Sequence, residues 1–144
     1  MASRTVNGSW TQNLLARPQK RVRSAVLELL SDSYETGDLV SVHSGLAILF
    51  AHYGITQPFR VTFVSPSTLA SRHKKAVLGD TDTKTGEIRL IWPKHWRRRR
   101  SWGSDKLRGR KGWMKVAVHE AAHWMMLFHT EDQAVSFERI VDKA

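Results

Sequence analysis

The chain has 144 residues, of which 41% are hydrophobic and 25% charged, and this predicts one folded domain with a sizeable core rather than a disordered chain. It has no cysteine, which excludes disulfides, cysteine nucleophiles and cysteine-ligated zinc, so any metal must be held by His, Asp or Glu. The net charge of +10 makes a polyanion the first partner to consider. No signal-peptide segment occurs near the N-terminus, and no apolar run approaches the roughly 20 residues of a membrane span. We therefore expect a cytoplasmic protein without a membrane partner.

The first half of the chain is predicted to be mainly helical. Residues 1–20 show no clear period and are interpreted as an N-terminal arm, followed by a single domain over 21–144. Apolar residues then recur at helical spacing, and a run of aromatic and β-branched residues comes after Pro58. The predicted elements of this half are two helices and one strand, at residues 19–32, 42–52 and 59–64.

A β-hairpin is predicted over residues 76–93. Its arms are Val77-Leu78 and the segment 87–92, joined by the polar loop GDTDTKTG. Residues 93–112 are basic, rich in Trp, Gly and Ser, and without a period, which predicts an exposed loop ended by Gly112.

Two helices are predicted after this loop. Residues 113–128 contain no Gly or Pro and many strong helix formers. Thr130 and Gln133 resemble a capping box, so a last helix is expected from Glu131 toward Lys143. Helices combined with a small sheet indicate the α+β class.

The helix at 113–128 contains the motif HEAAH, formed by His119, Glu120 and His123. Four residues turn a helix through about 400° and advance it by about 6 Å, so the two imidazoles project from one face. Such a pair can bind Zn2+, and the intervening carboxylate can take a proton from water. The helix is apolar on nearly every side, and buried His and Glu are costly unless they pair or bind metal. We therefore expect a zinc site with Glu120 as the base in peptide-bond hydrolysis.

Two features of this site stay open. The same three residues are also compatible with core histidines that bond to Glu120 and to backbone groups without an ion. A zinc site of this kind also needs a third protein ligand. His129 is the first candidate if the helix ends before it, and Glu138 on the expected last helix is the second. The remaining candidates are Glu131 and Asp132.

The segment HEAAHWMMLFH, preceded by the strand GEIRLIW, resembles the zincin superfamily of metallopeptidases over residues 76–140. The resemblance implies a zincin-like fold in which the HExxH helix packs against a small mixed sheet. It also implies that His119 and His123 are zinc ligands and Glu120 is the catalytic glutamate. By the same resemblance, GEIRLIW is the edge strand along which an extended substrate lies.

The position of His129 is similar to the third-ligand spacing of small WLM and SprT-like proteases, which cleave proteins attached to DNA. Metzincins share this spacing, but Met126 stands where they have glycine. The tail EDQAVSFERIV resembles the glutamate helix of small gluzincins of the ImmA and IrrE type, which keeps Glu138 as a ligand. Small proteins of this kind are also similar to some encoded by bacteriophages, for which the virion or the host cytoplasm would be the location.

Between Lys94 and Lys111, nine Lys and Arg oppose one Asp, a surplus of eight out of the total charge of ten. Cations can contact phosphates, and interleaved indoles can stack on unpaired bases. The candidate nucleic-acid contacts are Arg97, Arg98, Arg99, Arg100, Arg108, Arg110, Lys111, Trp96 and Trp102. The same pattern is also typical of a solvated loop whose tryptophans fold back onto the core, or of a contact with an acidic protein surface. The alternative to a protease is therefore a non-catalytic zincin-fold protein that binds nucleic acid or serves in a larger assembly such as a virion.

Overall fold

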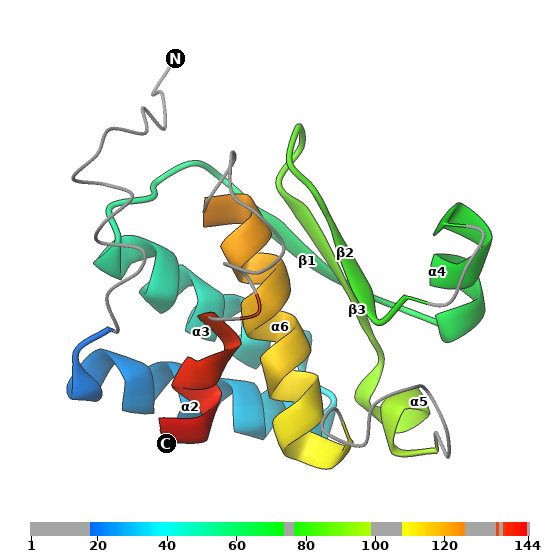
Figure 1. The fold of residues 1–144 in the computed structure, drawn as a ribbon, viewed down its shortest axis with the longest axis horizontal. Coiled ribbons are helices and arrows are strands. Elements are labelled where there is room, and N and C mark those ends of the chain that lie inside the picture. The colour runs from blue at the N-terminus through cyan, green and yellow to red at the C-terminus, as the bar shows by residue number, and fades with distance from the viewer. Residues whose placement is uncertain (1–17, 74–76, 99–107, 126–134, 136, 144) are drawn as a thin grey trace.

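The computed structural model describes residues 18–73, 77–98, 108–125, 135 and 137–143, and within them three helices lie together on one side of a small sheet (Figure 1). These helices are α2 (Lys20–Thr36), α3 (Leu39–His52) and α6 (Gly109–Met125). The strands are β1 (Arg60–Val64), β2 (Gly79–Asp82) and β3 (Glu87–Ile91). Three short helices complete the described fold: α4 (Pro66–His73), α5 (Pro93–Arg97) and the 3-10 helix η2 (Glu138–Lys143). The α+β class predicted from the sequence is confirmed.

Helices α2 and α3 occupy the predicted positions but are longer than expected. α2 continues past residue 32 because Ser33 and Tyr34 are buried against the core. It ends at Gly37, whose φ of 75° is easily adopted only by glycine and whose N–H donates to the Ser33 carbonyl. α3 begins earlier than residue 42 because the Asp38 carboxylate accepts the N–H of Val40 at 2.8 Å, which caps the helix.

The sheet has the order β1-β3-β2, with β1 parallel and β2 antiparallel to β3. The side of the sheet that faces the helices is buried. On the two longer strands, β1 and β3, it carries the apolar residues Val61, Phe63, Ile88 and Leu90. On the opposite side Asp80 Oδ1 lies 2.6 Å from the Nε of the register-paired Arg89, and both side chains are about nine-tenths buried. Burial opposes the charge of Arg89, but its hydrogen bond to Asp80 and the charge of Asp80 raise its pKa overall.

The predicted hairpin is present, with two corrections. β2 lies in residues that were expected to be loop, because its polar side chains find partners across the fold, such as Arg89 for Asp80. The turn ends at Gly86, which has a φ of 80°. The segment GEIRLIW contributes β3, the central strand, so its predicted position at the sheet edge is wrong. The edge strands of this described sheet are β1 and β2, which lie on either side of β3.

The segment expected to be a basic loop is helical at both of its ends. α5 occupies residues 93–97, and α6 begins at Gly109, so that Gly112 lies inside the helix rather than before it. Residues 99–107 lie outside the described part of the chain. α4 was not predicted, although Ser65 and Pro66 form a helix start in which Ser65 Oγ accepts the N–H of Thr68 at 3.2 Å.

The prediction that α6 is buried is confirmed, because most of its residues from Gly112 to Met125 are inaccessible. Trp113 joins it to the sheet by donating its indole N–H to the Ile91 carbonyl at 2.8 Å.

The expected arm falls mostly on residues 1–17, and the start of the expected last helix falls on residues 126–134, both outside the described part. Among the described helices none has the length and apolarity needed to cross a membrane.

Candidate metal centre

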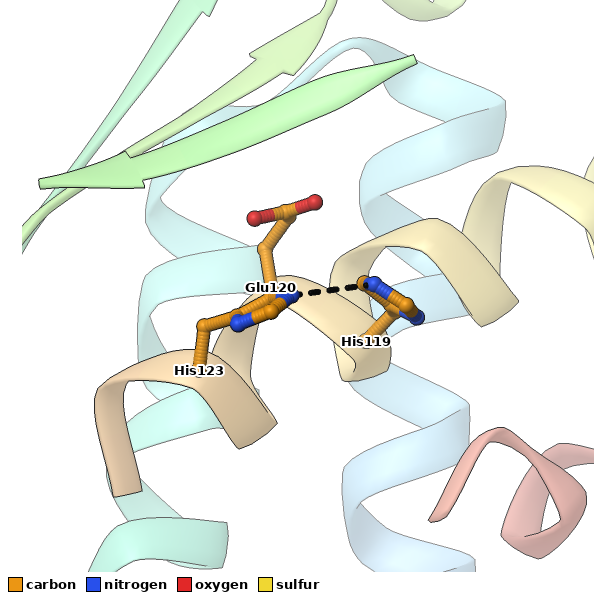
Figure 2. A group of neighbouring side chains, drawn as sticks. All are labelled: His119, Glu120 and His123. Carbon is orange, nitrogen blue, oxygen red and sulfur yellow. Dashed lines mark hydrogen bonds between the residues drawn. The ribbon is translucent and has the colours of Figure 1, made fainter. Parts of the chain in front are cut away.

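The C-terminal half of α6 brings His119, Glu120 and His123 together next to strand β2. The two imidazoles lie side by side on successive turns, and their Nε2 atoms are 3.1 Å apart (Figure 2). One potential ligand atom from each of the three residues lies within 4.8 Å of those of the other two. The predicted grouping of these residues is therefore present in the fold.

The spacing of the two imidazoles fits a single zinc ion. With Zn–N bonds of about 2.0–2.1 Å and tetrahedral angles, two ligand nitrogens on one ion lie about 3.3 Å apart. The 3.1 Å between the Nε2 atoms of His119 and His123 is within a few tenths of an ångström of that value. Small rotations of the two side chains would therefore be enough to accommodate the ion.

Glu138, from η2, reaches the other nitrogen of His119. Its Oε1 lies 2.7 Å from Nδ1, and both side chains are largely buried. A carboxylate at Nδ1 favours a proton on that nitrogen, which leaves the lone pair of Nε2 directed toward His123. In this arrangement Glu138 orients His119 and does not face the position between the two Nε2 atoms. This geometry differs from the ligand role considered for Glu138 from the sequence.

The Glu120 carboxylate points away from the imidazole pair toward the sheet (Figure 2). Only 7% of Glu120 is exposed, and its Oε1 accepts a hydrogen bond from the hydroxyl of Thr81 at 2.8 Å. The same hydroxyl lies 2.9 Å from the main-chain carbonyl oxygen of Glu120. β2 thus contacts the motif directly at its acidic residue.

The role of β2 was missed by sequence reasoning, because Thr81 and Gly79 lie in the segment taken for a polar loop. Thr81 is paired in register with Ile88, and Gly79 with Leu90, so both face α6. A strand could have been predicted here from the alternation of residue types. Thr81 lies between two aspartates, and successive side chains of a strand point to opposite faces of the sheet.

Several other predicted site residues fall outside the described part of the chain. Among the candidate third ligands these are His129, Glu131 and Asp132, and among the candidate nucleic-acid contacts they are Arg99, Arg100 and Trp102. Two described candidates of the basic segment are instead tied into the fold. Trp96 is 1% exposed and its indole N–H donates to the Gly109 carbonyl, as in the alternative in which tryptophans fold back onto the core. The Arg97 guanidinium lies over the Tyr34 ring, 4.6 Å from its centroid.

The other described cations of the segment remain on the surface. The exposed members are Lys94, Arg98, Arg108, Arg110 and Lys111. Arg110 lies 3.9 Å from Glu35 and 3.4 Å from the Ser31 hydroxyl, which links it to the end of α2.

Comparisons of the whole chain with protein-family models, with curated proteins and with solved structures find no match.

Proposed function

We propose that this protein is a zinc-dependent metallopeptidase with a zincin-like fold. The observation that carries the proposal is the opposed pair of Nε2 atoms, 3.1 Å apart on successive turns of α6, with a carboxylate oxygen of Glu120 within 4.8 Å of a ligand nitrogen of each histidine. His119 and His123 would hold the ion, and Glu138 would fix the orientation of His119. The third protein ligand would come from residues 126–134, where His129 is the first candidate.

The chemistry assigned to the chain's own residues is general base catalysis. Zinc in this position would supply a Lewis acid that polarises a peptide carbonyl and acidifies water. Glu120 would take a proton from the attacking water as oxygen bonds to the carbonyl carbon, and would return it to the amine nitrogen as the C–N bond breaks. A carboxylate suits both steps, because it accepts a proton and then donates it.

Strand β2 supplies a place for an extended substrate. It lies at the edge of the sheet and contacts α6 at the motif, through Thr81 and Gly79. An edge strand presents backbone N–H and C=O groups that can pair with an added strand. The scissile bond of a peptide lying along β2 would then pass close to Glu120.

The test is cleavage of casein and of a proteome-derived peptide library by the zinc-loaded protein, with products identified by mass spectrometry. We expect cleavage by the wild type and a loss of about 10²- to 10⁴-fold in Glu120→Gln, because the general base is removed while the shape is kept. Glu28→Gln is the matched control, since this exposed glutamate lies on α2 away from the motif. Equal cleavage by wild type and Glu120→Gln would contradict the proposal.

A second candidate function, polyanion binding, is supported by the clustering of exposed cations at the start of α6 and on α5. Apart from Arg97, whose guanidinium lies over the Tyr34 ring, the described members of this cluster are Lys94, Arg98, Arg108, Arg110 and Lys111, and we call these five the basic end. Binding of a fluorescent single-stranded oligonucleotide that weakens steeply with salt would support it. Absence of binding at low salt would contradict it.

A further inference from the structure

The Glu120 carboxylate is held from outside its own helix. Thr81, on β2, lies 39 residues away in sequence, and its hydroxyl oxygen is 2.8 Å from Oε1 of Glu120. A buried carboxylate needs hydrogen-bond donors to offset the loss of water, and the hydroxyl is one. The position of this acid group therefore depends on β2 as well as on α6.

Gly79 allows β2 to come close enough for this contact. A Cβ on Gly79 would lie 3.2 Å from Cγ of Glu120 and 3.1 Å from Cγ1 of Val116, which is tighter than ordinary packing. Gly79 and Thr81 are two residues apart and therefore face the same side of the sheet. The glycine brings the strand against the helix, and the threonine then reaches the carboxylate.

We propose that Thr81 is a positioning residue for Glu120: its hydroxyl holds the carboxylate in the orientation from which that group acts on water. The inference rests on the proposed peptidase function and adds a residue to its machinery. Glutamate has three side-chain torsions, so the carboxylate of an unrestrained Glu120 would sample several orientations. A group displaced by about 1 Å from its productive position can cost about 10²-fold in rate, and a hydroxyl on a paired strand limits such displacement.

The experiment compares Thr81→Val with Thr81→Ser, using the full chain loaded with zinc. Valine keeps the shape of threonine without the hydroxyl, whereas serine keeps the hydroxyl. Thr62→Val is the matched control, because the Thr62 hydroxyl also donates to a glutamate, Oε2 of Glu87 at 3.0 Å, on the other face of the same sheet. For each protein, casein cleavage, zinc content and the thermal unfolding midpoint are measured.

For Thr81→Val we expect kcat to fall about 10- to 100-fold with KM nearly unchanged, because substrate binding is kept while the base is misplaced. Thr81→Ser should recover most of the lost kcat, and Thr62→Val should cleave like the wild type. Zinc content should be equal in all four proteins. A purely structural role for Thr81 would lower the unfolding midpoint without this selective change in kcat.

Two outcomes would overturn the inference, and they are distinguishable. If the wild type cleaves, Glu120→Gln does not, and Thr81→Val cleaves like the wild type, the positioning role is wrong while the peptidase proposal stands. If the zinc-loaded wild type cleaves neither casein nor any peptide of the library, the peptidase proposal fails and the role of Thr81 fails with it.

Discussion

His119 has partners at both ring nitrogens, Glu138 at Nδ1 and His123 at Nε2. Carboxylates at the far nitrogen of a ligating histidine fix its tautomer and raise its basicity. We expect Glu138→Ala to weaken zinc binding about 10- to 100-fold, measured by competition with a chelator. Arg139→Ala, at the next and exposed position, is the control and should bind zinc like the wild type. Unchanged affinity in Glu138→Ala would contradict the orienting role, and so would a complete loss of zinc, which would mark Glu138 as a ligand.

The contacts made within α6 could be predicted from the sequence, and those made between distant segments could not. The relation of His119 to His123 follows from helix geometry alone once the helix is recognised. The bond from Thr81 to Glu120 depends on how β2 is paired and how closely it approaches α6, and no local pattern contains that information. Glu138 was an open candidate because its distance from His119 depends on the path of the intervening chain.

The β2–β3 hairpin depends on the glycine at its turn. Gly86 has a φ of 80°, and a Cβ there would lie 2.8 Å from the Pro58 carbonyl oxygen and 3.2 Å from the Trp124 ring. Gly37 has a φ of 75° but has no atom within 4 Å of such a Cβ. Gly37→Ala should therefore cost only the backbone strain, about 1–2 kcal/mol, whereas Gly86→Ala should cost clearly more. Chemical denaturation of both variants measures the difference, and equal losses would contradict the packing described at the hairpin.

Tyr53, at the end of α3, contacts Phe137 beside the segment that carries Glu138, with ring centroids 6.1 Å apart. Burial raises the pKa of Tyr53 from 10.0 to about 12, so the folded state favours the neutral phenol. Its ionisation should leave the free energy of unfolding unchanged below pH 10 and lower it between about pH 10 and pH 12. Tyr53→Phe lacks the ionisable group and should lose less stability over this range in denaturation experiments at fixed pH. An identical loss in both proteins would show that Tyr53 is not responsible.

Elements with an apolar period were predicted at the right places, and their ends were less accurate. Asp38 and Gly37 determine the boundary between α2 and α3 through a side-chain cap and a left-handed backbone, which a periodicity analysis does not use. β2 was predicted to be a loop because its residues are polar, which suggested contact with water. In the structure Asp80 instead pairs with Arg89, and Thr81 with Glu120. Charge dominated the interpretation of residues 93–112, although Pro93 and the buried Trp96 begin a helix there.

For the whole molecule, the α+β class could be predicted because the sequence contains both helical and strand patterns. The strand order, with β3 in the centre, could not be predicted, because it depends on which strands pair in the folded chain. The fold also separates the two candidate functions in space. Arg110 and His123 lie 13 residues apart on α6, about 20 Å at 1.5 Å per residue. A surface for polyanions and a zinc site at this separation should respond independently to mutation.

This separation gives a prediction for paired variants. Arg98→Ala combined with Arg108→Ala should weaken binding of a single-stranded oligonucleotide and reduce its salt dependence, because phosphate contacts are lost. The zinc content of that variant should be unchanged. His123→Ala should show the reverse pattern, with zinc lost and oligonucleotide binding kept. Fluorescence anisotropy at two salt concentrations and metal analysis provide the two readouts, and a joint loss of both properties in either variant would contradict independence.

The central claim is that the imidazole pair on α6 holds zinc, and metal analysis of the purified protein tests it most directly. We expect about one zinc per chain in the wild type and a large loss of zinc when either His119 or His123 is replaced by alanine. His43→Ala is the control, because His43 stacks on Phe59 at a centroid distance of 4.3 Å, away from the motif. A wild-type protein that takes up no stoichiometric zinc, or a His123→Ala variant that keeps it, would contradict the account.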